Sequence, residues 1–570
     1  MTDQHELRLR PGLAFAALLL SGRFGIALAY PGFEGFRIAF FVGLFSSLAI
    51  FVWWTFASRA PRVERWGAML LIFIGLLLTW RLNHPSMGLI WCLSYAVPWL
   101  SLALVTWAVA GQRLAERPRR VALAGVILLA CGGWTLVRSE GMTGDHTMHF
   151  AWRWAATAEE RLLAEGDDWT KRPTEVAPAT PGVSIAGPAG WPGFRGPGRD
   201  SLIRGNRLAT DWSSTPPIEL WRRPIGPGWS SFAVRGDRLY TQEQRGDDEV
   251  VACYDATTGE PVWSHRDKAR FFEAMGGAGP RATPNLDNNH VYTLGGTGLA
   301  NALDATDGTR VWSRDTLADT GVRVPVFGIA SSPLVAGDLV LYGVSGRLIA
   351  YDRATGEPRW LAPAGGASYS SPHRVVLDGV EQILLQSGAG AISVEPADGT
   401  VLWQSLWKGQ PLVQPAVTAD SDVLIAAGEG YGVRRLAITQ SPDGWTAEER
   451  WTSNRLKPNF NDFVIHHGHA FGFDGHILAC IDLEDGARRW KGGRYGQGQL
   501  VLLADQDLLL VLSEKGELAL VEASAEGFTE RARFPALEGK TWNHPVLIGD
   551  RLWVRNGQEM AAFRLPLSDQ

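Results

Sequence analysis

One phrase recurs along residues 191–570 and constrains the fold more than any other feature of the chain. It consists of a small residue, an acidic residue, a turn with glycine, and a strand that ends in tryptophan. Good copies are ACYDATTGEPVW (252–263), NALDATDGTRVW (301–312), IAYDRATGEPRW (349–360), ISVEPADGTVLW (392–403) and ACIDLEDGARRW (479–490). Weaker copies end at Trp451 and Phe534, and a fragment ends at Trp221. Self-similarity at a regular period indicates a repeat architecture.

The spacing of these terminal rings identifies the repeat as a propeller blade. Successive rings lie 39 to 49 residues apart, which is enough for four short strands with tight turns. We therefore predict an all-β, eight-bladed β-propeller, with seven blades as the alternative if one weak repeat is miscounted. The last repeat (542–565) lacks its final strand, and IELW (218–221) has only that strand, so pairing the two would close the ring.

The N-terminal quarter of the chain has a different character and predicts a helical membrane domain. Five segments have the length and apolarity of membrane spans: 12–30, 36–57, 66–82, 88–110 and 121–138. Arginines cluster in alternate loops, at Arg59, Arg62 and Arg65 and again at Arg113, Arg117, Arg119 and Arg120. Because basic loops stay in the cytoplasm, we expect a cytoplasmic N-terminus and a periplasmic propeller, anchored in a bacterial inner membrane.

Between these regions the sequence predicts a juxtamembrane segment. Residues 150–169 have apolar residues at roughly helical spacing beside an acidic face, which indicates a short amphipathic helix. Residues 170–190 are rich in Pro, Ala and Gly and predict an extended linker. The expected domains are thus 1–141 (five helices), 142–190 (helix and linker) and 191–570 (propeller). Arg23, in the middle of the first span, is expected to face the helix bundle or to reach the membrane surface.

The phrase A-x-D-x-x-T-G-x-x-x-W resembles the blade signature of the quinoprotein-type propellers, whose units are called PQQ-like repeats. The resemblance covers about 375 residues, from WPGFRGPGRD (191–200) to the C-terminus. The family includes quinone-dependent dehydrogenases and also non-enzymatic relatives, such as the lipoprotein that assists outer-membrane barrel assembly. Membrane-bound quinoprotein glucose dehydrogenases also place five spans before an eight-bladed propeller. The signature packs blades together and does not touch the quinone, so the resemblance implies the fold without assigning the cofactor.

Candidate binding residues are those that precede each inner strand, because they converge on one mouth of the central channel. They are Trp229, Arg281, Ser331, Ser370, Gln414, Asn461, Asp462, Gln499, Trp542 and Asn543. Two tryptophans, an arginine and a carboxylate suit an anionic aromatic ligand such as PQQ, but the set contains no cluster of oxygen ligands for Ca²⁺. The alternative is that these residues line a water-containing channel and satisfy the strand ends.

Other motifs carry less weight. HHGH (466–469) falls at a turn between two strands, and without a third ligand nearby we expect a solvated turn and no metal site. QEQRGDDEV (242–250) predicts a charged, solvated hairpin. Cys253 and Cys480 occupy equivalent positions of two repeats and are expected to be core thiols. The net charge of -5 argues against a nucleic-acid partner.

These features favour a membrane-anchored periplasmic propeller that binds a protein or a small ligand, with no cofactor assigned. Compact blades of about 45 residues leave little room for the long insertions that usually build a quinone pocket. The alternative is a membrane-bound PQQ-dependent dehydrogenase of alcohols or sugars that passes electrons to ubiquinone, with PQQ and Ca²⁺ as its cofactors.

Overall fold

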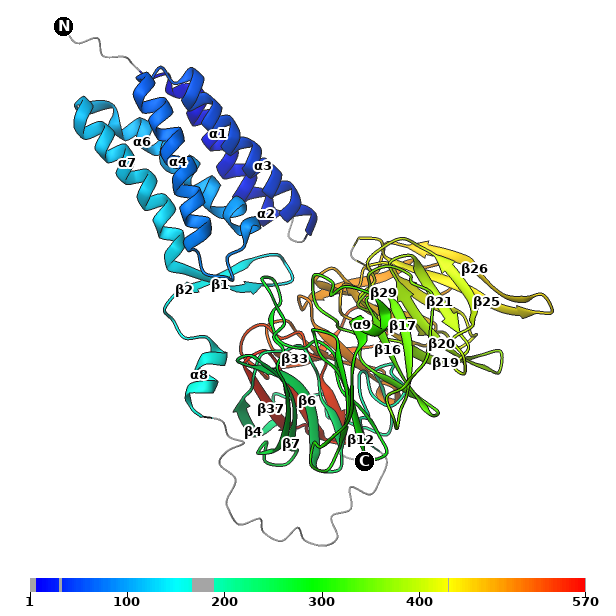
Figure 1. The fold of residues 1–570 in the computed structure, drawn as a ribbon. Coiled ribbons are helices and arrows are strands. Elements are labelled where there is room, and N and C mark those ends of the chain that lie inside the picture. The colour runs from blue at the N-terminus through cyan, green and yellow to red at the C-terminus, as the bar shows by residue number, and fades with distance from the viewer. Residues whose placement is uncertain (1–6, 30–32, 167–188, 429, 569–570) are drawn as a thin grey trace. The chain divides into compact units, whose positions relative to one another are not determined.

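A computed structural model describes residues 7–29, 33–166, 189–428 and 430–568 (Figure 1). The chain divides into two compact units: residues 1–155 with 274–277, and residues 156–273 with 278–570. The linker expected at 170–190 falls almost wholly outside the described residues.

The first unit is a bundle of apolar helices followed by a short β-hairpin. Its helical segments are α1 (Leu9–Leu20), η1 (Ser21–Gly25), α2 (Ile26–Ala29), α3 (Phe33–Val52), η2 (Trp53–Ala57), α4 (Arg62–Leu82), α5 (Leu89–Trp91), η3 (Cys92–Ala96), α6 (Val97–Ala110), η4 (Gly111–Arg113), α7 (Glu116–Gly132) and η5 (Gly133–Leu136). The hairpin pairs β1 (Val137–Met142) with β2 (Met148–Trp152) in antiparallel register.

Four of the described helices are long and apolar enough to cross a membrane, one fewer than the five spans expected. They are Gly35–Ala57, Arg62–Leu82, Leu89–Arg113 and Glu116–Leu136. The segment expected as the first span is helical from Leu9 to Ala29, through α1, η1 and α2, but does not belong to this set. Arg10 and Arg23 lower its apolar character.

Arg23 faces the interior of the helix bundle. Its side chain is buried, its Nε donates to the Ser94 carbonyl oxygen at 3.2 Å, and its guanidinium lies 4.7 Å from the centre of the Tyr95 ring. The cation is therefore held by a carbonyl and an aromatic face within the bundle.

The second unit contains eight blades of four antiparallel strands each, to one of which β3 (Leu202–Ile203) adds a fifth, parallel strand, and this confirms the predicted propeller. Blades 1 to 4 are β5 (Ala233–Arg235), β6 (Arg238–Arg245), β7 (Asp248–Asp255), β8 (Pro261–Asp267); β11 (Asn285–Asp287), β12 (His290–Leu294), β13 (Leu299–Asp304), β14 (Arg310–Asp315); β15 (Leu334–Ala336), β16 (Leu339–Val344), β17 (Arg347–Asp352), β18 (Pro358–Leu361); and β19 (His373–Leu377), β20 (Val380–Ser387), β21 (Gly390–Val394), β22 (Val401–Leu406).

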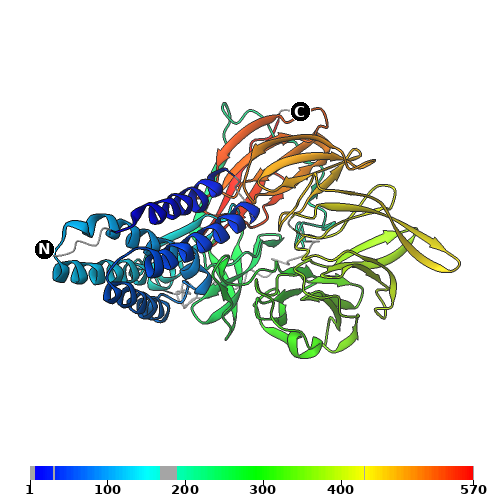
Figure 2. The ribbon, with the colours of Figure 1, turned by 90° about the horizontal axis from the view of Figure 1, so that it is seen from above.

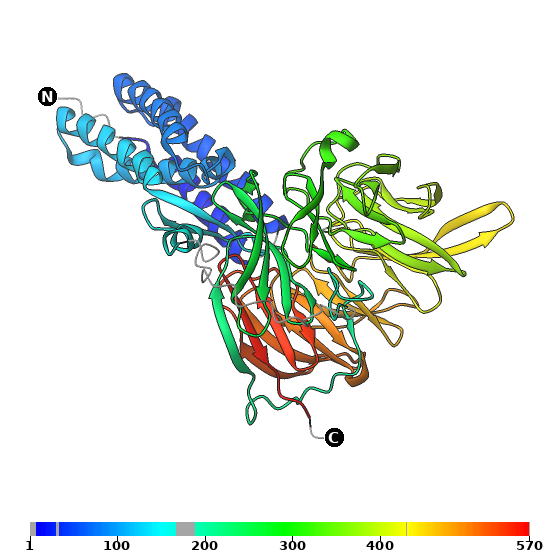
Figure 3. The same cartoon turned by 60° about the horizontal axis from the view of Figure 1, so that its bottom comes forward.

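Blades 5 to 8 complete the ring. They are β23 (Ala416–Val417), β24 (Val423–Ala426), β25 (Val433–Ser441), β26 (Gly444–Ser453); β27 (Val464–His466), β28 (His469–Asp474), β29 (Ile477–Asp482), β30 (Arg488–Arg494); β31 (Gln499–Leu503), β32 (Leu508–Leu512), β33 (Glu517–Glu522), β34 (Glu530–Pro535); and β35 (Val546–Ile548), β36 (Arg551–Arg555), β37 (Glu559–Arg564), β4 (Ile218–Pro224). The blades follow one another in chain order, from green through yellow to red (Figures 2 and 3).

The ring is closed as the sequence predicts. β4, the strand that contains IELW, is the outermost strand of blade 8 and pairs antiparallel with β37. Two ends of the propeller that are more than 300 residues apart in the sequence thus share one sheet, which leaves no blade incomplete.

The recurring tryptophan and glycine form one repeated contact between blades. In at least five blades the indole Nε1 of the last tryptophan donates to a carbonyl oxygen in the turn of the next blade: Trp221 to Ala256 (3.1 Å), Trp263 to Ala305 (3.1 Å), Trp312 to Arg353 (2.9 Å), Trp360 to Pro396 (3.1 Å) and Trp451 to Leu483 (2.9 Å). The same indole covers the turn glycine: a Cβ on Gly308 would lie 2.4 Å from Trp263. The predicted packing of tryptophan over the blade junction is therefore confirmed.

Some shorter elements differ from the expectations. Residues 148–152 form strand β2, so the helix expected at 150–169 is only α8 (Ala158–Ala164), where Thr157 and Glu160 form a capping box. The remaining short elements are β3 (Leu202–Ile203), β9 (Phe272–Glu273), β10 (Gly277–Ala278), α9 (Thr316–Thr320) and η7 (Ala504–Gln506).

The core thiols Cys253 and Cys480 are fully buried and free, as predicted.

The solvated hairpin expected at 242–250 was wrong. β6 and β7 extend through these residues and leave only Gly246 and Asp247 in the turn. Glu243 is buried and accepts hydrogen bonds from Arg245 Nε (2.8 Å) and from the Tyr254 hydroxyl (2.9 Å). The polar residues form a buried network between neighbouring blades. Their hydrogen-bond partners compensate the cost of burying them.

The contact between blades can be tested with two glycines of nearly identical backbone conformation. Gly308 has φ +76° and packs under Trp263, whereas Gly379 has φ +77° and no atom within 4 Å of an added Cβ. In both variants the alanine must adopt a left-handed backbone conformation, which lowers the stability by a similar amount. The difference in stability between the two variants therefore measures the steric contact with Trp263. We expect Gly308→Ala to lose about 1–3 kcal/mol more stability than Gly379→Ala. Unfolding of the full-length chain in detergent measures this, and equal losses would contradict the proposed role of the contact.

Candidate functional site

The centre of the propeller is occupied by the chain itself. The inserted segment, residues 191–203, crosses the innermost strands before the first blade begins. Trp191 and Val234 of β5 exchange two backbone hydrogen bonds, and Leu286 of β11 donates to the Pro192 carbonyl oxygen. At its far end β3 pairs in parallel with β31, the innermost strand of blade 7. The segment therefore contacts blades on opposite sides of the ring.

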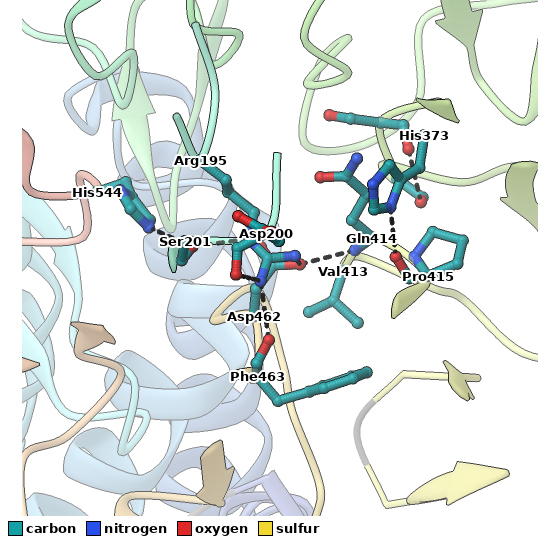
Figure 4. Close-up of polar contacts among 12 residues, drawn as sticks. Arg195, Asp200, Ser201, His373, Val413, Gln414, Pro415, Asp462, Phe463 and His544 are labelled. Atoms are coloured by element: carbon teal, nitrogen blue, oxygen red, sulfur yellow. Dashed lines mark hydrogen bonds and ion pairs between the residues drawn. The ribbon is translucent and has the colours of Figure 1, made fainter. Parts of the chain in front are cut away.

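Arg195 anchors the inserted segment to blade 6. Its side chain is 1% exposed, and Nη1 lies 3.2 Å from Asp462 Oδ1 (Figure 4). Nη2 donates to the carbonyl oxygens of Phe463 (2.8 Å) and Asp200 (3.1 Å), and Nε donates to Ser201 Oγ (2.8 Å). Three hydrogen bonds and an ion pair thus compensate the burial of this guanidinium.

Arg199 anchors the same segment to blade 3. It is buried, and its Nη atoms donate to the carbonyl oxygens of Pro333 (2.7 Å) and Ser332 (3.3 Å). Burial, with the nearby Arg195 acting in the same direction, lowers the pKa of Arg199 to about 9. Arg195 and Arg199 both have positive φ, at 63° and 52°, so the segment is coiled tightly around its two anchors.

Two buried histidines border the inserted segment in the neutral form. His544 Nε2 lies 3.0 Å from Ser201 Oγ, and His373 Nδ1 lies 2.9 Å from the Pro415 carbonyl oxygen (Figure 4). Burial lowers the pKa of His544 to about 3 and that of His373 to about 4. Neither carries a charge at neutral pH.

A belt of hydrogen bonds links adjacent blades just before their innermost strands. The backbone N–H of one blade donates to a side chain of the next: Ser231 to Thr283 Oγ1 (3.0 Å), Thr283 to Ser332 Oγ (3.0 Å), Ser332 to Ser371 Oγ (2.9 Å) and Gln414 to Asp462 Oδ1 (2.8 Å). Sequence reasoning selected Ser331 and Ser370, which stand one position earlier. The hydroxyl residue that directly precedes a proline, as in SSP and ATP, is the signal that marks the belt.

The structure brings together two predicted residues, Trp229 and Trp542, in an aromatic cluster. Their ring centres are 4.7 Å apart, and Phe460 packs on Trp542 at 4.8 Å. Lys540 Nζ lies 4.3 Å from the Trp542 ring and 5.1 Å from that of Trp229. Burial lowers the pKa of Lys540 to about 8, while Glu273 and Glu514 act against this shift. Phe460 and Lys540 were missed, although Phe460 stands four residues before β27, as Trp229 and Trp542 stand four residues before β5 and β35.

Arg281 has a different set of contacts from the other predicted residues. Its Nη2 lies 3.3 Å from Glu273 Oε1, its Nη1 donates to the Gly279 carbonyl oxygen at 2.6 Å, and its guanidinium lies 4.9 Å from the Phe271 ring centre. Burial lowers the pKa of Arg281 to about 10. These contacts hold the loop before blade 2.

The remaining predicted residues mainly satisfy strand ends. Ser331 Oγ accepts from Gly343 N (3.2 Å), Ser370 Oγ donates to the Ser371 carbonyl oxygen (3.4 Å), Asn461 Oδ1 accepts from Asn459 N (2.9 Å), Gln499 Nε2 donates to the Phe460 carbonyl oxygen (3.2 Å), and Asn543 Nδ2 donates to that of Ser230 (2.7 Å). Within the described residues, Gln414 Oε1, Asn461 Nδ2 and Asn543 Oδ1 are buried without a partner. Such atoms suit buried water or the polar groups of a small ligand.

These contacts do not fit PQQ together with a divalent cation. The cation would need several anionic or carbonyl oxygens that converge on one point. Asp462 is the one carboxylate of the predicted set, and its Oδ1 already binds Arg195 and the Gln414 N–H. Burial raises the pKa of Asp462 although Arg195 acts in the opposite direction. The orphaned amides and the aromatic cluster suit a small polar or anionic ligand.

A groove of about 1360 Å³ lies over the inserted segment. Arg195, Gly198, Asp200 and Leu202 contribute to its wall. Its rim carries charges of both signs, including Arg374, Arg435, Arg450, Asp420, Asp482 and Asp505. The rim residues come from blades 4 to 7, so the groove spans several blades and suits an extended polar partner.

Comparison with known proteins follows from this architecture. An eight-bladed ring joined by tryptophan and glycine contacts defines a repeat propeller. The family model described as outer membrane protein assembly factor BamB matches residues 217–374 and 328–492, just under half of the chain. Over residues 217–492 the chain is similar to this PQQ-like repeat family, and its propeller follows apolar helices at the N-terminus.

Solved structures with similar folds are distant in sequence. BamB from Moraxella catarrhalis is 14% identical, covers 62% of this chain and 99% of its own, and has a TM-score of 0.46. Quinohemoprotein alcohol dehydrogenase from Comamonas testosteroni is 13% identical, covers 67% of this chain and 82% of its own, and has a TM-score of 0.47. A comparison with curated proteins finds no match. Neither ligand nor activity is transferred from these structures.

Glu249 links blades 1 and 2 and generates a pH prediction. Its buried carboxylate accepts from Gly296 N at 3.0 Å, and burial raises its pKa to about 7 from an ordinary value of 4.5. The folded chain therefore keeps this proton in a range where the unfolded chain has lost it. The resulting stabilisation is complete below pH 4.5 and is lost as the pH rises through about 7.

We expect Glu249→Gln, which is neutral at every pH, to remove this pH dependence. Relative to the unchanged chain, the variant should gain up to about 3 kcal/mol at pH 8 and less than about 1 kcal/mol at pH 5. Denaturant unfolding of the full-length chain in detergent at both values measures the difference. The exposed Glu357→Gln is the control and should leave the pH profile unchanged. A Glu249→Gln profile parallel to that of the unchanged chain would contradict the assignment.

Proposed function

We propose that the protein is a membrane-anchored binding module whose propeller receives a periplasmic protein on its surface. The observation that carries this proposal is the inserted segment: Arg195 and Arg199 fix it across the ring, so the centre of the propeller is filled by the chain itself. A partner then has the groove above this segment as its docking surface. The matched family model supports a protein partner, since its description is that of an assembly factor.

The domain organisation that we propose has a membrane domain over 1–141, a juxtamembrane segment over 142–190 and the propeller over 191–570. The propeller lies outside the cytoplasm in this proposal. Arginines are more numerous at one end of the four apolar helices, at Arg59, Arg62 and Arg65 and at Arg113, Arg117, Arg119 and Arg120, than at the other end, where Arg37, Arg81 and Arg138 lie. α7 begins at the arginine-rich end and therefore ends at the other face of the membrane. The location of the propeller follows from this direction of α7 and does not depend on whether the first helical segment crosses the membrane.

Reporter fusions test this orientation. An enzyme that is active only outside the cytoplasm, fused after residue 142, is expected to be active. The same reporter fused after residue 60, in the arginine-bearing loop, is expected to be inactive. The opposite pair of results would place the propeller in the cytoplasm and contradict the proposal.

A quinone-dependent dehydrogenase is the second candidate function. The aromatic cluster favours it, because Trp229 and Trp542 with the Lys540 cation suit an anionic aromatic ring. The pairing of Asp462 with Arg195 disfavours it, since that carboxylate is engaged within the protein.

Site-specific photo-crosslinking tests the binding proposal. Val376 on β19 is 61% exposed and borders the groove, whereas Val311 on β14 is 46% exposed and lies outside it. A photo-reactive residue at position 376, introduced into the full-length chain in its source cells, is expected to form a discrete protein adduct. The same residue at position 311 should form none. Equal adduct formation at both positions would contradict the groove as the docking surface.

A titration separates the two functions. PQQ with Ca²⁺ is added to the full-length chain in detergent while absorbance and dye-linked oxidation of alcohols and sugars are followed. We expect neither saturable binding nor turnover. Stoichiometric binding with turnover would overturn the binding-module proposal in favour of the dehydrogenase.

A further inference from the structure

The HHGH turn acquires a third candidate ligand in the folded chain. His466 ends β27 and His467 follows in the turn, while Asp507 lies in the corresponding turn of the next blade. Asp507 Oδ1 is 2.6 Å from His466 Nε2 and 3.2 Å from His467 Nε2. One ligand atom from each residue can be chosen so that all three lie within 4.8 Å of one another. The expectation of a solvated turn rested on the lack of such a third ligand.

We propose that His466, His467 and Asp507 form a binding site for a divalent transition-metal cation of the zinc type. Two imidazoles and one carboxylate are a common three-residue ligand set for zinc, which prefers tetrahedral coordination. Bonds of about 2.0–2.1 Å in that geometry place ligand atoms about 3.3 Å apart. The present separations of 2.6 and 3.2 Å are thus within a small side-chain adjustment of that arrangement.

Each ligand is held by the backbone or by its surroundings. The His466 side chain is only 9% exposed, which limits its freedom. His467 has φ +45° and Asp507 has φ +51°, in turns where other blades place Gly236, Gly337 or Asn288. His469 Nδ1 lies 2.7 Å from the His467 carbonyl oxygen and helps to orient the turn.

The site opens onto the groove described above. His466 and His467 both belong to the groove wall, beside Asp505 and Glu484. Three protein ligands leave at least one coordination position, which a water molecule or a donor atom from the groove would complete. The metal site is independent of the proposed protein-binding function, because it depends on three residues and on no partner.

Metal titration of the full-length chain tests the proposal. The chain is purified in detergent without a histidine tag and stripped with a chelator, and Zn²⁺ and Co²⁺ are then titrated by calorimetry and by visible absorption. We expect one equivalent of tightly bound metal, a Co²⁺ spectrum typical of tetrahedral coordination, and an increase in melting temperature with Zn²⁺.

Two variants remove ligands without disturbing the turns. His467→Asn places asparagine where Asn288 occupies the equivalent turn of blade 2 at φ +47°, and Asp507→Asn keeps a residue type that tolerates a left-handed backbone. Both are expected to bind the metal at least tenfold more weakly while their metal-free melting temperatures stay unchanged. His290→Asn, at the start of β12, is the control and should bind as the unchanged chain does.

The outcomes are unambiguous. Loss of the tight site in both ligand variants but not in the control supports the proposal. No tight binding to the unchanged chain, or equal binding to all four proteins, would overturn it. Because the photo-crosslinking experiment uses Val376 and no metal, failure of the metal site and failure of the protein-binding function are distinguishable.

Discussion

The contact of one blade's tryptophan with the next blade's turn is the interaction on which the propeller depends. The turn is built locally: Asp255 Oδ1 accepts from the N–H groups of Thr257 and Thr258, and Gly259 then reverses the chain at φ +72°. That reversal presents a flat surface and a free carbonyl oxygen at Ala256, and Trp221 covers both. The signature therefore encodes a turn and the surface that receives the neighbouring indole, so each blade specifies its own attachment.

This explains why the fold was predictable from the sequence and also where the pattern changes. The period, the blade count and the closure by β4 follow from the repeated turn and tryptophan. Blade 5 lacks the signature turn and has instead the long hairpin of β25 and β26. Trp403, the ring that would have packed on that turn, donates to Gln382 Oε1 within its own blade at 2.9 Å. The ring tolerates one altered junction because closure holds both sides of it.

The candidate site was less predictable, because its residues meet across the ring. Arg195 and Asp462 are 267 positions apart, and nothing in either local sequence indicates the other. The same holds for His466 and Asp507, which belong to turns of adjacent blades. Sequence position selected Trp229 and Trp542, whose rings pack together, but it could not show that a segment before the first blade would cross the innermost strands.

The inserted segment also contacts several of the compact blades as it crosses their innermost strands. The innermost strands are only two to five residues long, and small polar residues such as Ser231, Thr283 and Ser332 stand just before them. Arg195 and Arg199 fill the remaining space and donate to oxygens of blades 3 and 6. Burying two cations costs free energy. Removing a partner such as Asp462 would leave one buried charge without compensation and would lower the stability by about 3–5 kcal/mol. The segment thus connects blade 3 to blade 6. The surface above it is a groove lined by charges of both signs, and a partner can bind there.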